Sequence, residues 1–210
     1  MKLSLPKQIN KYVDGLNYNL DNVGRSEDKV IIFENKYVLK ISRDIKRLKR
    51  EKDINEWLDG KTPGPKNIAF VTENNLCYYL RTALNGYSLI DDRFINNPNL
   101  LIDCLSKAIT LLRELEKYNC EYLSFESSGK AFIHGDLCLP NIYFDENNNF
   151  IGFIDLSGAG LGDPWQDYSW MLWSLEYNLG TNKYHQILLD KINVKFDEEK
   201  YNEFIPEEDR

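Results

Sequence analysis

The sequence has few of the residues from which metal centres, disulfide frameworks and membrane spans are built. It has two histidines in 210 residues, and its four cysteines, Cys77, Cys104, Cys120 and Cys138, form no CxxC pair. The sequence therefore indicates neither a zinc site nor a disulfide framework, and reduced thiols fit a cytoplasmic protein. No apolar run is long enough to span a membrane, and residues 1–10 lack the apolar core of a secretory signal.

Basic residues are also fewer than acidic residues. Only 26 Lys and Arg residues face 33 Asp and Glu residues, which gives a net charge of -7. Such a field disfavours nucleic acid and anionic membranes as partners and mildly favours a cationic ligand. Apolar material is plentiful, because 42% of the residues are hydrophobic and 13% are aromatic. That is enough for a folded core in one domain or in two small lobes.

The chain changes character near residue 84. Before it, short β-rich runs alternate with turn residues, and one helix is predicted after the N-cap Asp44. After it, helical spacing prevails, as in the amphipathic run Pro98–Tyr118. This order predicts an α+β protein with a small antiparallel sheet lobe over residues 1–83 and a mainly helical lobe over residues 84–210. Clefts between lobes are common ligand sites.

The strongest chemical pattern is an HxDxxxxN segment, His134 to Asn141, followed by Asp155 at the end of an apolar strand. Phosphoryl transfer needs a carboxylate beside the acceptor hydroxyl, and oxygen ligands that hold Mg²⁺ against the nucleotide phosphates. Asp136 suits the first task, and the Asn141 amide with the Asp155 carboxylate suits the second. Each residue alone could be a loop cap or a surface turn, but the three in this order point to a kinase.

A second group of residues fits the same chemistry. In the strand Tyr37–Ile41, alternation places Val38 and Lys40 on one face, where Val38 would cover a base and Lys40 the phosphates. The following helix places Glu51 within an apolar stripe, and an inward carboxylate needs a cation such as Lys40. Glu56 is a competing partner that lies off the stripe, and a solvated lysine on an edge strand is the alternative for Lys40.

The turn between the first two predicted strands is a weaker candidate. Gly24-Arg25-Ser26 could present backbone amides and the Ser26 hydroxyl to phosphates. It has one glycine instead of a glycine-rich loop, so on local sequence alone a plain hairpin turn explains it slightly better.

Together these residues resemble the protein-kinase-like superfold and, more narrowly, the aminoglycoside 3'-phosphotransferase family. The HGDxxxxN pattern is shared with choline, macrolide and fructosamine kinases. Two further stretches are similar to this family in particular: residues 50–66, which contain WLDGK and PGPK, and residues 152–167, from GFIDL to GDPWQD. The similarity runs from about Asn17 to the C-terminus, with one gap.

The resemblance implies a Mg²⁺-dependent small-molecule kinase that moves the γ-phosphate of ATP or GTP to a hydroxyl group. In this family the acceptor is a cationic sugar. Carried over by position, the resemblance makes Asp136 the catalytic base and Asn141 with Asp155 the Mg²⁺ ligands. Lys40, oriented by Glu51, would hold the α- and β-phosphates.

The same resemblance assigns supporting roles. Ser26 would touch the outer phosphates, and the linker from Thr82 to Leu84 would bind the purine edge through backbone groups. His134 would be a scaffold of the catalytic loop instead of a titrating base. Asp167 would be a buried helix residue that braces this loop by hydrogen bonds.

Two departures from the family concern the substrates. At Val38 the family often has an aromatic residue that stacks on the purine, so the sequence does not set a preference between ATP and GTP. Between the core helix and His134 the family has a long helical insertion that forms much of the acceptor pocket. Here Asn119–Ile133 replaces it, which is too short for more than a turn and a strand. The chain is therefore expected to be a shortened member.

The acceptor stays open on sequence grounds. The acidic C-terminal residues Glu207, Glu208 and Asp209 could meet a cationic acceptor, as such residues do in relatives, or could simply be a solvated tail. A shortened acceptor lobe also suits another small metabolite or a macromolecule. A non-catalytic nucleotide-binding module is the alternative from another class, but such a module would need no catalytic base.

Overall fold

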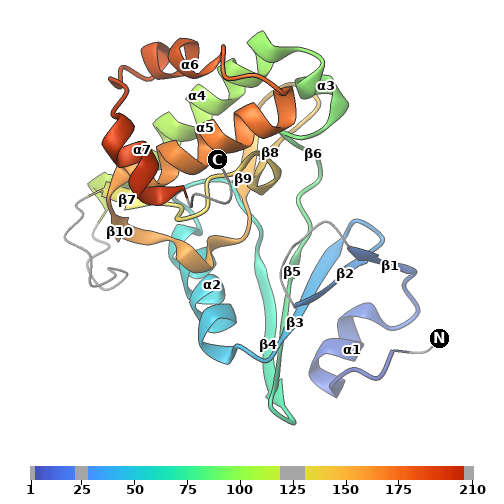
Figure 1. The fold of residues 1–210 in the computed structure, drawn as a ribbon. Coiled ribbons are helices and arrows are strands. Elements are labelled where there is room, and N and C mark those ends of the chain that lie inside the picture. The colour runs from blue at the N-terminus through green and yellow to red at the C-terminus, as the bar shows by residue number, and fades with distance from the viewer. Residues whose placement is uncertain (1–2, 22–27, 119–130, 206–210) are drawn as a thin grey trace. The chain divides into compact units, whose positions relative to one another are not determined.

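The computed structural model describes residues 3–21, 28–118 and 131–205 of the chain. The chain divides into two compact units, residues 1–85 and 86–210 (Figure 1). Among the helices described, none is long and apolar enough to cross a membrane.

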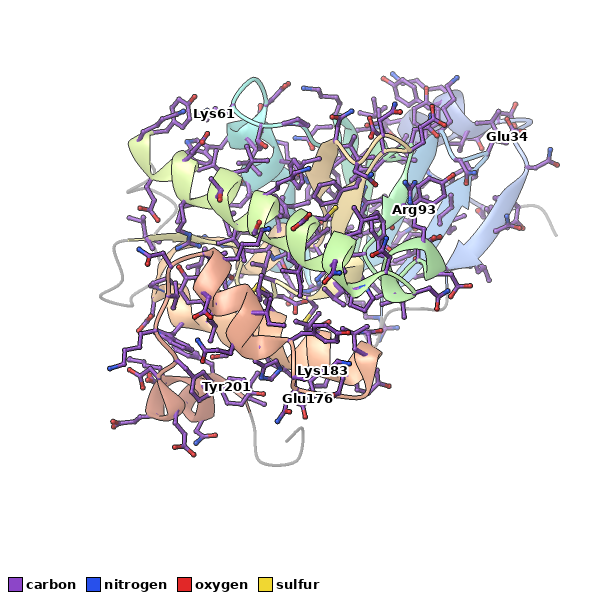
Figure 2. The ribbon with its side chains drawn as sticks, turned by 90° about the horizontal axis from the view of Figure 1, so that it is seen from above. Glu34, Lys61, Arg93, Glu176, Lys183 and Tyr201 are labelled. Atoms are coloured by element: carbon purple, nitrogen blue, oxygen red, sulfur yellow. The ribbon has the colours of Figure 1, made fainter. Side chains whose placement is uncertain are left out.

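The first unit is a five-stranded antiparallel sheet, in the order β1-β2-β3-β5-β4, with a helix on each face (Figure 1). Its elements are α1 (Lys7–Val13), β1 (Tyr18–Asp21), β2 (Lys29–Phe33), β3 (Tyr37–Ser42), α2 (Ile45–Leu58), β4 (Asn67–Glu73) and β5 (Leu76–Thr82). Glu34, labelled in Figure 2, fixes the chain entering β1, because its carboxylate accepts hydrogen bonds from both the backbone and the side-chain nitrogen of Asn17.

The pairing of β3 with β5 decides which side chains share a face of this sheet. Val38 lies opposite Arg81, and Lys40 lies opposite Tyr79. Directly opposed residues of antiparallel strands point to the same side, so these four share a face, and Tyr79 packs there against α2. Leu39 points to the other face and packs against α1. The alternation predicted for this strand is therefore confirmed.

Helix α2 begins at the N-cap that its sequence predicts. The Asp44 carboxylate accepts a hydrogen bond from the Arg47 backbone nitrogen at 3.0 Å, which caps the first turn. The chain leaves the helix before Gly60, which takes a left-handed φ of 77°. Leu48, Glu51 and Ile54 form the buried stripe.

The first unit contains one helix more than the sequence predicts. Helix α1 spans seven residues, of which only Ile9 and Val13 are buried, and no side chain caps its start. Its polar composition carries almost no periodic signal, because the helix is stabilised by packing these two side chains against the sheet. That packing is tertiary and leaves little trace in a local pattern.

The second unit combines helices with two small antiparallel sheets, β10-β7 and β6-β8-β9. Its elements are β6 (Tyr87–Ser88), α3 (Asp92–Ile95), α4 (Pro98–Glu114), the 3-10 helix η1 (Leu115–Lys117), β7 (Ala131–Ile133), the 3-10 helix η3 (Leu139–Asn141), β8 (Ile142–Phe144), β9 (Phe150–Phe153), the 3-10 helix η4 (Leu156–Gly158), β10 (Gly160–Gly162), α5 (Pro164–Leu179), α6 (His185–Lys191) and α7 (Glu198–Phe204). The predicted helix Pro98–Tyr118 is α-helical to Glu114 and tightens into η1 after it.

The β8–β9 hairpin positions the segments that flank it. Arg93 of α3, labelled in Figure 2, donates hydrogen bonds of 3.0 Å to the Glu146 carbonyl and the Asn148 side chain in the hairpin turn. At the open end, the Ile154 backbone nitrogen donates to the Asn141 carbonyl at 3.0 Å. Asn141 therefore lies opposite Ile154, and Asp155 is the next residue along the chain.

Replacing the N-cap of α2 tests how much this cap stabilises the helix that carries Glu51. Asp44→Ala removes the acceptor of the Arg47 backbone nitrogen, and we expect the free energy of unfolding to fall by about 1 kcal/mol in urea titrations. Asp44→Asn, which keeps an acceptor oxygen, is the control and should stay within about 0.5 kcal/mol of the parent. An Asp44→Ala variant as stable as the Asn variant would contradict this role of the cap.

Candidate active site

Lys40 and Glu51 form a buried ion pair between β3 and α2. The Lys40 ammonium donates to both carboxylate oxygens of Glu51 at 2.8 Å, and the two residues are 6% and 0% exposed. The competing candidate Glu56 points to solvent, where it pairs with Lys52. The pair expected from the helical stripe is therefore present, and it fixes the Lys40 ammonium on the sheet face that Lys40 shares with Val38.

A polar contact that the sequence did not predict anchors α2 beside this pair. The Asn55 amide donates to the Tyr79 hydroxyl at 2.8 Å, and this hydroxyl donates in turn to the Asn67 side chain. Burial raises the pKa of the Tyr79 hydroxyl, which therefore stays neutral and donates. The network ties the helix to β4 and β5 and so fixes the position of Glu51.

The linker that follows β5 already uses two of its backbone N–H groups. The Thr82 backbone nitrogen donates to the Lys66 carbonyl and the Ala83 nitrogen to the Lys36 carbonyl, both at 2.9 Å. The Thr82 carbonyl accepts a long contact of 3.4 Å from the Arg81 side chain. The Thr82 carbonyl and the Leu84 backbone are therefore the linker groups to consider for a purine edge.

In the second unit, Asp136 and Asn141 face each other within one loop. Asp136 is exposed and Asn141 is buried. The Asn141 side-chain nitrogen donates to the Asp136 carboxylate at 2.9 Å and to the Asp136 carbonyl at 3.0 Å. The carboxylate is thus held by one oxygen on a solvent-facing loop, which is the arrangement that a proton acceptor for an incoming hydroxyl needs.

The Asp167 carboxylate on α5 is fully buried and holds this loop in place. It accepts hydrogen bonds from the backbone nitrogens of His134 and Gly135, both at 2.9 Å, and from the Arg113 guanidinium at 3.1 Å. Burial raises the pKa of the Asp167 carboxyl, while Arg113 and the two backbone N–H groups act against that rise. The bracing contacts expected of Asp167 are present.

His134 is enclosed, as a scaffold residue would be. Its side chain is fully buried and lies edge-on to the Phe153 ring, 5.5 Å between centroids. Its Nδ1 accepts a hydrogen bond from the Asp136 backbone nitrogen at 3.3 Å. The imidazole therefore shapes the turn that presents Asp136.

Asp155 follows β9 in a left-handed conformation, with φ 61° and ψ 43°. This turns the chain sharply one residue after Ile154, which lies opposite Asn141. The Asn141 nitrogen faces Asp136, so its amide oxygen is the atom that a cation could use. In the described residues no group of three or more His, Cys, Asp or Glu side chains could hold a metal. An amide and a carboxylate fit Mg²⁺, which takes few protein ligands when phosphates and water supply the rest.

The loop and the segment after Asp155 meet at two glycines. Gly135 has a left-handed φ of 86°, and a Cβ added there would lie 2.3 Å from the Gly158 carbonyl oxygen. No larger residue fits at this close approach without a shift of backbone.

Three residues that hold the loop were not predicted from the sequence. Arg113 pairs with Asp167, the Gln166 side chain donates to the Gly135 carbonyl at 2.9 Å, and the Ser174 hydroxyl accepts from the Leu139 nitrogen at 3.0 Å. Only Gln166 lies in a stretch that the family resemblance had drawn attention to. The other two have no local signal, because their partners are distant in sequence.

Several predicted site residues fall on parts of the chain that the structure does not describe. Ser26, the acidic residues Glu207, Glu208 and Asp209, and positions 119–130 lie outside the described residues. Of the other predicted residues, those for the nucleotide lie in the first unit, and those for catalysis and metal lie in the second.

The sequence matches proteins of one kind. Residues 102–204 match the phosphotransferase enzyme family. The chain is 27% identical to a probable aminoglycoside 3'-phosphotransferase of Lactococcus lactis subsp. lactis (strain IL1403), over 87% of this chain and 88% of the relative. It is 23% identical to an aminoglycoside 3'-phosphotransferase of Enterococcus faecalis, over 97% of each chain. That alignment runs over 258 positions against the 210 residues of this chain, so the relative has residues that this chain lacks.

Solved structures agree on the fold. Aminoglycoside phosphotransferase APH(3'')-Id from Streptomyces rimosus, in complex with ADP and streptomycin, superposes with a TM-score of 0.74 at 16% identity, over 94% of this chain and 93% of that chain. An aminoglycoside-3'-phosphotransferase of type VIII gives a TM-score of 0.72 at 16% identity, over 93% and 94%. The α+β, kinase-like fold class predicted from the sequence is confirmed.

The Gly135 contact can be tested by a matched pair of substitutions. Gly135→Ala forces a Cβ into the Gly158 backbone and a left-handed alanine, and we expect it to lower the free energy of unfolding by at least about 2 kcal/mol. Gly158→Ala is the control, since its Cβ would meet its nearest atom at 3.4 Å and its φ is ordinary. Urea titration measures both, and equal stability of the two variants would show that the close approach is not a constraint.

Proposed function

Because residues 102–204 match the phosphotransferase enzyme family, we propose that the chain is a Mg²⁺-dependent kinase that transfers the γ-phosphate of a nucleoside triphosphate to a hydroxyl group of a small cationic molecule. The observation that carries the proposal is the exposed Asp136 carboxylate, held by Asn141 on a loop that the buried Asp167 fixes. The relatives are aminoglycoside phosphotransferases, so an aminoglycoside is the first acceptor to test and antibiotic resistance the expected phenotype.

Within this reaction Asp136 accepts the proton of the attacking hydroxyl. Only one Asp136 oxygen is bonded to Asn141, so the other can orient that hydroxyl toward the phosphorus. Asn141 and Asp155 would hold Mg²⁺, which would neutralise charge on the phosphates. The protein therefore contributes mainly positioning and charge neutralisation.

Lys40 and the linker bind the nucleotide. Glu51 uses both oxygens to aim the Lys40 ammonium, which then contacts the α- and β-phosphates. Val38 covers the base on the same sheet face, and the Thr82 carbonyl with the Leu84 backbone binds the purine edge. Ser26 touches the outer phosphates.

The chain's shortness favours a second class of acceptor. The Enterococcus faecalis relative has residues that this chain lacks, and a reduced acceptor region would admit a smaller amino alcohol, a sugar or a protein. Assays of Mg²⁺-dependent transfer from ATP and GTP should therefore run across aminoglycosides, amino alcohols, sugars and protein. Nucleotide binding without transfer or hydrolysis under any of these conditions would favour a binding module instead.

We place the enzyme in the cytoplasm. Cys77, Cys104 and Cys138 are buried free thiols, and burial raises the pKa of the Cys77 and Cys104 thiols to about 11. Unpaired thiols of this kind suit a reducing compartment, which also holds the nucleoside triphosphates that the reaction consumes. Nucleic acid and membranes are not expected as partners, given the net charge of -7.

Asp136→Asn tests the proposed base. The amide keeps the size of the side chain but cannot accept the proton, so we expect turnover to fall by roughly 10²- to 10⁴-fold while the Kd for Mg-nucleotide stays within about twofold. Asp190→Asn, an exposed position on α6, is the matched control and should leave both values unchanged. Retained turnover in Asp136→Asn would remove Asp136 from this role.

Asp155→Ala tests the metal ligand and should behave differently. Loss of one of the two protein ligands weakens Mg-nucleotide binding itself, by roughly 10-fold or more, and turnover falls with it. Calorimetry with and without Mg²⁺ separates the effects, because binding of metal-free nucleotide should change little. An unchanged affinity for Mg-nucleotide would contradict the assignment.

A further inference from the structure

We propose that Arg81 makes the nucleotide site select guanine over adenine, so that GTP is the preferred phosphate donor. The inference rests on the proposed function, because it takes the sheet face of Lys40 as the nucleotide site. It deepens that function by naming the purine of the preferred nucleotide, guanine or adenine, a choice that the sequence left open.

Arg81 is a buried cation that lacks a carboxylate partner among the described residues. It is 3% exposed, and among the described residues its Nε is buried without a hydrogen-bond partner and its side chain makes a long contact of 3.4 Å from Nη1 to the Thr82 carbonyl. Both oxygens of Glu51, the buried carboxylate of α2, accept from Lys40. A guanidinium keeps its charge and has five donors and no acceptor, so leaving it unsatisfied is costly. A bound ligand that supplies acceptors would relieve this cost.

Its position places this donor group where the base is expected. On β5, Arg81 lies opposite Val38 of β3, the residue expected to cover the base. It also directly precedes the linker that begins with Thr82, and its Nη1 lies at the Thr82 carbonyl, the acceptor offered to the purine edge. All of these residues belong to the first unit.

Guanine and adenine differ in the groups that they present to such a donor. Guanine carries two acceptors, O6 and N7, on one edge, and arginine pairs with both at once. Adenine carries an amino donor in place of O6, so it would compete with the Arg81 Nη1 for the Thr82 carbonyl and bring two donors together. A site with an arginine here is therefore matched to guanine, by roughly 5- to 150-fold for a good bidentate pair.

The first experiment compares binding of Mg-GDP, Mg-IDP and Mg-ADP to the full chain by isothermal titration calorimetry. Hypoxanthine keeps O6 and N7 but lacks the 2-amino group of guanine. We expect GDP and IDP to bind alike, and both to bind roughly 5- to 150-fold more tightly than ADP. Equal affinity for ADP and GDP would overturn the inference, and so would an IDP affinity as low as that of ADP, because selection would then lie with the 2-amino group.

Variants of Arg81 identify the residue responsible. Arg81→Met removes the donors at similar length and should abolish the preference for GDP, and Arg81→Lys, which keeps the charge without the fork, should weaken it. The exposed Arg43→Met is the matched control and should keep the full preference. Thermal unfolding checks that each variant is folded, and a folded Arg81→Met that still prefers GDP would overturn the inference.

The outcomes also separate this inference from the proposed function. If the wild-type chain binds neither Mg-GDP nor Mg-ADP, the proposed function fails and the inference fails with it. If it binds both equally and transfers phosphate, the function stands and only the role of Arg81 is lost. The wild-type comparison of three nucleotides needs no variant, so a folding defect at Arg81 does not obstruct the test.

Discussion

The second unit depends on one buried charge, the Asp167 carboxylate. It accepts hydrogen bonds from two backbone N–H groups of the loop at residues 134–141 and from the Arg113 guanidinium, and it has no exposed surface. Burying a carboxylate is costly unless its hydrogen bonds are all made. The loop, α4 and α5 must therefore keep fixed positions relative to one another. As a result, the turn that presents Asp136 to solvent is also fixed.

The first unit uses buried charge in a second way. Lys40 donates to both carboxylate oxygens of Glu51 across β3 and α2, so each buried charge has a partner of opposite sign and the direction of the ammonium is fixed. Arg81, on the same face, lacks such a partner among the described residues. The two cations therefore have different consequences. The charge of Lys40 is compensated by Glu51, which also orients it, whereas Arg81 favours a ligand that supplies hydrogen-bond acceptors.

Most of the fold and the central site residues could be predicted from the sequence because their causes are local. Strand alternation assigned Val38 and Lys40 to one face, and helical spacing assigned Glu51 to the buried stripe of α2. The spacing of Asp136 and Asn141 within eight residues predicts the candidate catalytic loop, and the two side chains do meet there. What failed lacked local periodicity: the short α1 was missed because its stability comes from packing against the sheet.

The sequence by itself determined which residues are candidates for the chemistry, since residue type and near-neighbour spacing are properties of the chain. Only the tertiary structure decided how they are held. It brought Arg113 to Asp167 across 54 positions and Ser174 to Leu139 across 35, and it left Arg81 buried without a carboxylate partner in the described chain. Such contacts depend on where distant elements pack, and burial alone makes an unsatisfied donor costly. The same arginine read in the sequence is one charge among 26 basic residues.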